Sequence, residues 1–391
     1  MLNTLKHWRE KANHPQLAKD IFQQDKLGLH DNDPGNDAVI KALIEWLCLA
    51  QDSSPSNDGG VSRDYSLIKG WNTSYPETTG YIIPTLINIA HIRNQPHLLD
   101  RAKRMLDWCE AIQLPGGGFQ GGRIDAKPIV PVTFNTGQIL LGLTSGVIEF
   151  DAYHETMHKA ARFLRDSLDS DGCWRKNPTP FAEDGEKAYE THVAWGLFEA
   201  DRIAPEEGYA DAGLAQVQWA ISKQHKNGWV DECCLANPEK PLTHTLGYFL
   251  KGLIEAHRFS NDEKILEAAI KTASGLLTVQ RPDGSLPGRL KSDWSPAVSW
   301  SCLTGNVQIA DSWFYLFNST QENRYFEAAL AANKFVRKTI STNGIDGIRG
   351  GVKGSFPVNG DYGAYEYLNW AAKFALDSFI TEETLLNQNT P

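Results

Sequence analysis

Side chains that can move protons lie close together in the segment 189–192, which reads Tyr-Glu-Thr-His. Phenol, carboxyl and imidazole groups are common partners in general acid–base catalysis. A second histidine, His244, follows one repeat later, and two glutamates precede apolar segments near the two ends of the chain. We therefore expect a catalytic centre made of six residues: Tyr189, Glu190, His192, His244, Glu77 and Glu366.

Two kinds of chemistry fit these six side chains. Two carboxyl groups about 5 to 9.5 Å apart can cleave a glycosidic bond, one as the acid and the other as base or nucleophile. A tyrosine and a histidine can instead take a proton from carbon, which gives epimerisation or elimination. The alternative for each glutamate is a helix cap, because negative charge is stabilised at a helix N-terminus. The alternative for a lone histidine is a structural core residue.

The segments that separate the expected helices are rich in glycine, aromatic residues and cations. Aromatic rings stack on sugar faces, and the planar guanidinium group of arginine matches a carboxylate or a sulfate. Any single ring can instead cap the core, and any single cation can simply be solvated. We expect ten of these residues to bind a substrate, with the five aromatic ones lining one cleft: Arg63, Trp71, Tyr75, Arg123, Trp174, Trp229, Arg289, Lys353, Asp361 and Tyr365.

Short polar segments recur along the chain, and each is followed by an apolar segment. Their last residues are 53 to 64 positions apart, at Gly80, Gly137, His192, Thr245, Gly305 and Asn369. Polar caps before apolar runs indicate helix starts, and helices apolar nearly all round are buried. Amphipathic segments with a 3.6-residue period lie between them, at 36–51, 95–113, 151–168, 208–224, 261–280 and 322–340.

This alternation predicts an all-α protein, an (α/α)6 toroid in which six buried helices form an inner ring and six amphipathic helices surround it. We expect residues 36–391 to form this single domain and residues 1–35 to form an N-terminal helical extension. Long segments lead from each outer helix to the next inner helix, and long loops usually serve function. They must all emerge where the inner helices begin, so this end is the expected active face.

The composition argues against several classes of protein. A net charge of −10 disfavours general binding to nucleic acid or to a membrane surface. No stretch reaches the roughly 18 apolar residues of a membrane span, and the N-terminus lacks the apolar core of a signal peptide. The six cysteines form no CxxC pair, so we expect a reduced, cytoplasmic protein. P-loop, dinucleotide-binding and zinc-protease motifs are missing, so we expect no cofactor and no metal.

The glycine- and aromatic-rich loops, such as LPGGGFQGG at 114–122, resemble those of (α/α)6 carbohydrate-active enzymes. That group includes polysaccharide lyases, uronyl hydrolases and sugar epimerases. The stretches 74–86 and 350–374 are similar to uncharacterised proteins of bacterial polysaccharide gene clusters. A more distant resemblance is to the helical repeat of terpene cyclases and protein prenyltransferases, whose DxDD motif and zinc triad have no counterpart here.

The resemblance implies an enzyme that acts on an acidic, uronate-containing oligo- or polysaccharide. We expect hydrolysis by a carboxylate pair first, and a C5-epimerase or lyase reaction second. A non-catalytic glycan-binding scaffold would have stacked aromatics without convergent acid and base groups. An isoprenoid enzyme would have a dry, apolar lumen.

Overall fold

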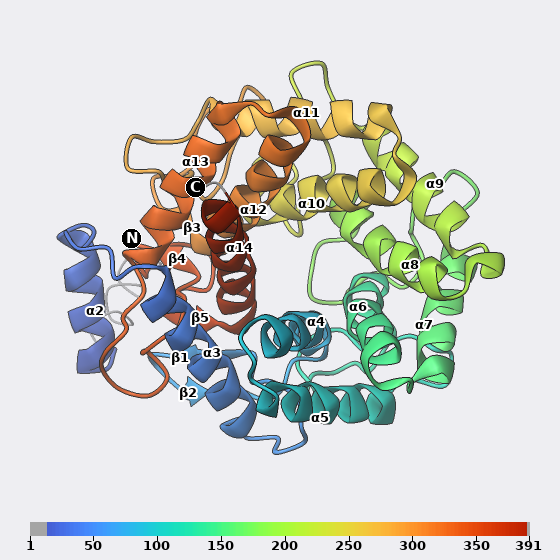
Figure 1. Ribbon diagram of the computed structural model, residues 1–391, viewed down its shortest axis with the longest axis horizontal. Helices are drawn as coiled ribbons and strands as arrows, with labels where there is room; N and C mark the ends of the chain where they lie inside the picture. Colours follow the sequence, from blue (N-terminus) through green and yellow to red (C-terminus); the bar gives the residue numbers. More distant parts are fainter. Residues whose placement is uncertain (1–13, 389–391) are drawn as a thin grey trace, which may run out of the picture.

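The computed structural model describes residues 14–388, and its helices alternate between two concentric rings (Figure 1). The inner helices are α4 (Pro76–Ile92), α6 (Thr133–Phe150), α8 (Thr191–Ile203), α10 (Thr243–Ser260), α12 (Leu303–Thr320) and α14 (Asn369–Gln388). The outer helices are α3 (Asn36–Asp52), α5 (His97–Ile112), α7 (His154–Ser167), α9 (Tyr209–Ser222), α11 (Glu263–Leu277) and α13 (Asn323–Arg337). The expected (α/α)6 toroid is confirmed.

The two rings differ in how they bury their side chains. In α7, Met157, Ala161 and Leu164 are buried against the inner ring, while Lys159 and Arg162 are exposed. Inner helix α6 is buried over most of its circumference. Burial of apolar surface stabilises both rings. In the sequence, the outer helices appear as apolar residues with a 3.6-residue period, and the inner helices appear as nearly continuous apolar segments.

Glycines let the inner helices approach one another closely. A methyl group placed on Gly80 of α4 would lie 2.4 Å from the Cα atom of Ile139 in α6. A methyl group on Gly137 of α6 would lie 2.5 Å from Val193 Cγ1 in α8. These glycines occupy equivalent positions in consecutive repeats, so the recurring polar segments mark helix contacts as well as helix starts.

Short strands close the ring at the end where the inner helices begin. Strand β1 (Asp64–Ser66) pairs with β2 (Gly70–Trp71) and, antiparallel, with β5 (Glu366–Leu368). The register places Ser66 opposite Glu366. Strands β3 (Ser301–Cys302) and β4 (Ser355–Phe356) form a second pair. The loop before the first inner helix is thereby joined to the loop before the last one.

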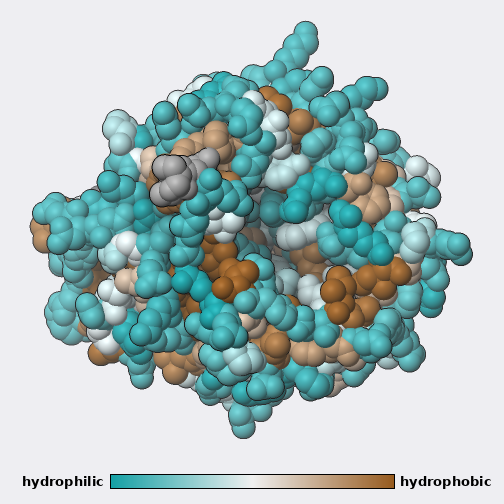
Figure 2. Space-filling view, in the orientation of Figure 1, coloured by the Kyte–Doolittle hydropathy of each residue, from teal (hydrophilic) through white to brown (hydrophobic). Residues whose placement is uncertain are grey.

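Helix α2 (Gln16–Lys26) lies outside the rings, in the described part of the expected N-terminal extension; residues 1–13 of that extension lie outside the described residues. Figure 2 shows a mainly hydrophilic face with hydrophobic side chains gathered around a central hollow. Between residues 14 and 388, no helix combines the length and apolar character needed to cross a membrane.

Candidate active site

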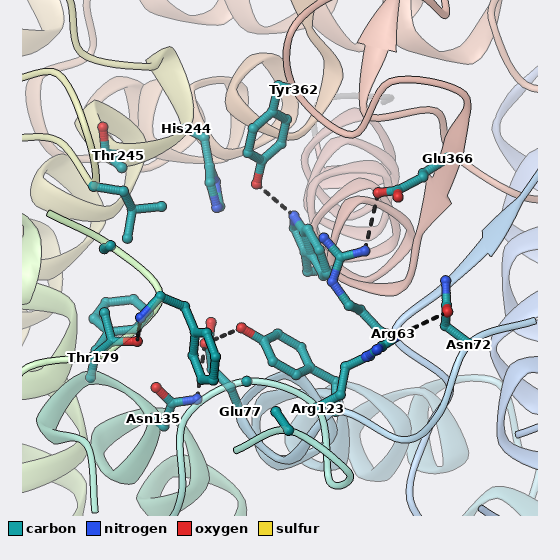
Figure 3. A pocket seen from close by; sticks show the side chains of 18 of the residues that line it. Arg63, Asn72, Glu77, Arg123, Asn135, Thr179, His244, Thr245, Tyr362 and Glu366 are labelled. Carbon is teal, nitrogen blue, oxygen red and sulfur yellow. Dashed lines mark hydrogen bonds and ion pairs between the residues drawn. The ribbon is translucent and has the colours of Figure 1, made fainter. Parts of the chain in front are cut away.

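A large cavity opens at the end of the toroid where the inner helices begin. It has a volume of about 680 Å³ and is lined by residues of α4, α6, α10 and α14 and of the loops before them (Figure 3). The expected active face therefore carries a cavity. Its charged and polar side chains come from segments far apart in the sequence, which the ring brings together.

Glu77 lies in the first turn of α4 and reaches into this cavity (Figure 3). Its Oε2 atom accepts hydrogen bonds from the Tyr75 hydroxyl at 3.0 Å and from Asn135 Nδ2 at 3.2 Å. Burial raises the pKa of Glu77 to about 7, although the Tyr75 hydrogen bond and the charge of Arg63 oppose the rise. A substantial fraction of this carboxyl is therefore protonated at neutral pH.

Arg63 and Glu366 meet because β1 and β5 pair. Arg63 Nη1 lies 3.1 Å from Glu366 Oε2 and also contacts Asp64. The Arg63 guanidinium group lies over the ring of Trp370, 5.2 Å from its centroid. Burial raises the pKa of Glu366, and the positive charge of Arg63 opposes that rise. The ring closure thus places a second carboxyl group on the cavity wall.

Two further cations line the cavity. Arg123 Nη1 donates to Asn72 Oδ1 at 2.7 Å and its Nε atom lies 3.4 Å from Asp125. Lys69, in the turn between β1 and β2, is exposed and lines the cavity. This wall therefore presents positive charge on side chains that are still accessible.

His244 projects from the first turn of α10 into the cavity (Figure 3). Its Nδ1 atom lies 2.7 Å from Gln308 Oε1 of the next inner helix. With the amide oriented this way, Nδ1 carries the proton and Nε2 keeps its lone pair. Burial lowers the pKa of His244 to about 4, so the imidazole is neutral at physiological pH.

Aromatic rings form much of the remaining wall and floor. Tyr248 contacts the His244 ring at 4.3 Å between centroids, and Phe134 packs against Tyr248 and Tyr189. On the ring-closing side, Trp370 Nε1 donates to the Tyr362 hydroxyl at 2.8 Å. Aromatic walls with a few convergent polar groups are typical of ligand sites.

The structure brings seven of the sixteen expected site residues to this cavity: Tyr75, Glu77, Tyr189, His244, Arg63, Arg123 and Glu366. Among these, the expected proximity of Glu77 and Glu366 through ring closure is found. The other nine lie elsewhere, each for an identifiable reason.

Two of the expected catalytic residues are separated from the cavity by its wall or floor. Glu190 ends a 3₁₀ turn, η1 (Ala188–Glu190), and lines a smaller neighbouring cavity. His192 is fully buried in the lumen, with Nδ1 2.7 Å from Gln138 Oε1 and its ring against Tyr248. Burial lowers the pKa of His192 well below its ordinary value. Tyr189, Glu190 and His192 thus do not form one centre.

Four of the five expected aromatic residues pack against other parts of the protein. Trp71 contacts Trp46 and Tyr65, and Tyr365 contacts His14. Trp229 is buried against Trp294. Trp174 donates its indole hydrogen to the Leu164 carbonyl of α7 and lines the smaller cavity. Only Tyr75 of the five lines the central cavity, so the expectation of one common aromatic cleft is wrong for the described residues.

Three expected charged residues have other positions. Lys353 is buried and forms an ion pair with Asp25 of α2, so it attaches α2 to the toroid instead of facing a substrate. Arg289 donates to the Lys240 carbonyl at 2.9 Å. Asp361 is mostly exposed, 3.8 Å from Arg289. None of the three lines the central cavity.

Sequence reasoning did not select several lining residues. They include Asn72, Phe134, Asn135, Thr245, Tyr248 and Trp370. Asn135 and Thr245 stand in the recurring polar segments, and Tyr248 follows His244 by one helical turn, so both signals were present in the sequence. In residues 14–388, His, Cys, Asp and Glu side chains form no cluster of three or more that could hold a metal ion.

No protein-family model and no curated protein sequence matches this chain. Solved structures do. An unsaturated glucuronyl hydrolase specific for heparin aligns with a TM-score of 0.72 and 15% identity, over 90% of this chain and 99% of that one. The unsaturated glucuronyl hydrolase of Bacillus sp. GL1 gives 0.68 and 14%, over 87% and 96%. Cellobiose 2-epimerase from Bacillus thermoamylovorans B4167 gives 0.69 and 12%, over 88% and 100%. At these identities the likeness shows the fold, and the chain has the (α/α)6 toroid of these carbohydrate-active enzymes.

Proposed function

We propose that this protein is a carbohydrate-active enzyme that cleaves a glycosidic bond in an acidic saccharide, with Glu77 as the general acid. The observation that carries the proposal is the carboxyl group of Glu77, which lies in an aromatic-lined cavity with a pKa near 7. A general acid works best when its pKa is close to the working pH. The toroid that the chain shares with glucuronyl hydrolases and a sugar epimerase supports a carbohydrate substrate.

The hydrogen bonds of Glu77 define which of its oxygens gives up the proton. Tyr75 and Asn135 both donate to Oε2, so that atom acts as the acceptor. The proton of the neutral carboxyl group then resides on Oε1, from which it passes to the glycosidic oxygen as the bond to the leaving sugar breaks. The same two hydrogen bonds stabilise the carboxylate that remains.

Glu366 is the candidate for the second carboxyl group. Burial raises the pKa of Glu366, and its contact with Arg63 opposes this rise. An ionised carboxylate on the cavity wall can accept a proton from the attacking water while Glu77 protonates the leaving group. Arg63, Lys69 and Arg123 provide positive charge for the carboxylate of a uronate unit.

His244 supports the second candidate function, proton transfer at a sugar carbon. Its Nε2 atom holds a free lone pair because Nδ1 faces Gln308. However, a histidine with a pKa of about 4 is a weak base, and burial keeps the pKa of the Tyr189, Tyr248 and Tyr362 phenols well above its ordinary value. Epimerisation or elimination therefore ranks second.

The other two alternatives fit the cavity less well. An isoprenoid enzyme needs a dry, apolar lumen, whereas this lining includes carboxyl, guanidinium and imidazole groups. A non-catalytic scaffold needs no acid with a pKa near 7 beside a second carboxyl group.

A panel of acidic oligosaccharides analysed by mass spectrometry in deuterated water tests the proposal. Hydrolysis gives two shorter products whose masses sum to that of the substrate plus water. Elimination gives a product lighter by water than the hydrolysis product, and epimerisation gives an unchanged oligosaccharide that takes up deuterium at carbon. Deuterium uptake without cleavage would replace hydrolysis by the second candidate, and unchanged masses across the panel would refute enzymatic action on these glycans.

A further inference from the structure

A second cavity of about 360 Å³ lies next to the central one. Phe134, Thr179 and Tyr189 border both cavities, so the two spaces share a wall. Trp174 forms another part of the lining. A chain of sugar units that occupies the central cavity therefore has an adjoining space with aromatic sides.

Glu190 provides an unsatisfied polar group in this second cavity. The residue is only 7% exposed, and its Oε2 atom is buried without a hydrogen-bond partner in the described part of the chain. Buried carboxyl oxygens normally have partners, because an unpaired one retains the cost of losing water. Burial raises the pKa of Glu190 to about 8, with Lys187 opposing.

The charges around Glu190 are unevenly paired. Arg175 contacts Asp169, Asp171 and Glu186, and Lys176 lies 3.4 Å from Asp169. Lys187 Nζ lies 3.5 Å from the Leu235 carbonyl. By contrast, the lining carboxyl groups of Glu183, Asp184 and Glu190 have no ion pair within residues 14–388. Glu183 and Asp184 are exposed to solvent, so Glu190 is the buried acid of this set that lacks an ion pair.

We propose that the second cavity is a subsite for a positively charged substituent, the ammonium group of an amino-sugar unit, which donates to the carboxyl group of Glu190. This inference rests on the proposed function, because the amino sugar would adjoin the acidic unit in the central cavity. The substrate class is then a saccharide that carries both a carboxylate and an unacetylated amine. An ammonium group supplies the missing donor, and its positive charge compensates the negative charge that Glu190 acquires when it releases its proton.

Proton release distinguishes this pairing from a neutral hydrogen bond. Without ligand, Glu190 holds its proton at pH 6, and an ammonium ion bound at Oε2 favours the carboxylate, so the proton passes to the solvent. Other ionisable groups line the same cavity or lie beside it: Arg175, Lys176, Glu183, Asp184, Glu186, Lys187, the Tyr189 phenol and the Cys173 thiol. Burial raises the pKa of the Tyr189 phenol and of the Cys173 thiol, so both keep their protons at pH 6. The Glu190→Gln variant retains all of these groups, so it separates their proton exchange from that of Glu190.

Isothermal calorimetry at pH 6 with a glucosamine disaccharide and its N-acetylated form tests the subsite. We expect the amine to bind about tenfold or more tightly than the amide, and to release close to one proton, measured from the heats in two buffers of different ionisation enthalpy. Glu190→Gln should abolish the preference and the proton release. Glu190→Asp should retain proton release, and Glu149→Gln at the end of α6 is the matched control.

Equal binding of amine and amide by the unaltered protein would overturn the inference, as would proton release that survives Glu190→Gln. Stronger binding of the amide without proton release would assign Glu190 as a neutral donor to an acyl oxygen and would also overturn it. The measurement needs no turnover, so it can fail or succeed independently of whether Glu77 proves to be the general acid.

Discussion

Glu77 and Glu190 stand at the starts of two inner helices, and burial raises the pKa of both. Their surroundings nevertheless differ. Glu77 accepts two hydrogen bonds and faces the central cavity, whereas Glu190 Oε2 has no partner in the described residues and lies in the neighbouring cavity. A raised pKa therefore does not by itself identify a proton donor. The two glutamates differ in the hydrogen bonds that fix the position of the proton and in their access to a substrate.

The distinction between Glu77 and Glu190 is tested most directly by replacing each with glutamine, which is neutral and has nearly the same shape. Glu77→Gln should lower kcat by roughly 10²-fold or more while substrate binding is kept, because the amide cannot give a proton to the leaving group. Glu190→Gln should lower kcat far less. Steady-state kinetics and calorimetric binding measure both effects, with Glu149→Gln as the control. Equal losses in the two variants would contradict the distinction.

The pH dependence of kcat/KM sharpens the assignment of Glu77. The reaction needs Glu77 protonated and Glu366 ionised. Activity should therefore fall about tenfold per pH unit above the Glu77 pKa of about 7, and it should also fall at low pH as Glu366, whose pKa is raised by burial, takes up a proton. His244 gains its proton only near pH 4, so it adds no second change between pH 5 and pH 7. A profile that stays flat up to pH 9 would remove Glu77 from the role.

The pH dependence of the free energy of unfolding should identify the contribution of Glu190. The pKa of Glu190 is about 8 in the folded protein against the ordinary 4.5, so the folded protein keeps a proton that the unfolded chain releases. This stabilisation is complete below pH 4.5 and is lost as the pH rises towards 8. Relative to Glu190→Gln, the unaltered protein should lose at most about 1.4 kcal/mol per pH unit in this window.

Urea unfolding of the two proteins at pH 5, 6, 7 and 8 measures that difference. Glu77 titrates in both proteins, so its contribution cancels. Parallel stability curves would show that Glu190 is hydrated in the folded protein and would contradict the raised pKa of its carboxyl group.

The helical architecture could be predicted from the sequence because the residues that each helix buries recur along the chain with a helical period. The amphipathic segments expected at 95–113 and 261–280 are α5, 97–112, and α11, 263–277. That Glu77 and Glu366 line one cavity also followed from the repeat, since a closed ring makes the first and last inner helices neighbours.

The loop side chains were harder to predict because their directions depend on contacts that have no local signal. Trp71 and Trp229 face Trp46 and Trp294, which are distant in sequence. Lys353 pairs with Asp25, 328 positions away. The repeat that aligns Gly80 with His192 places Glu77 level with Tyr189, not with Glu190, so the two glutamates differ by one position in the repeat. Glu190 precedes α8 in a 3₁₀ turn, whereas Glu77 is inside the first turn of α4.

The pairing of β1 with β5 has a consequence for the order of events during synthesis. Arg63 and Glu366 are 303 positions apart, and Trp370 belongs to the helix that completes the ring. Contacts of such high sequence separation form late, because much of the chain must be ordered before their ends can meet. A nascent chain that already contains Glu77 and His244 therefore has only part of the cavity wall. If the proposed function holds, a chain that lacks α14 has an incomplete cavity and should be catalytically inactive.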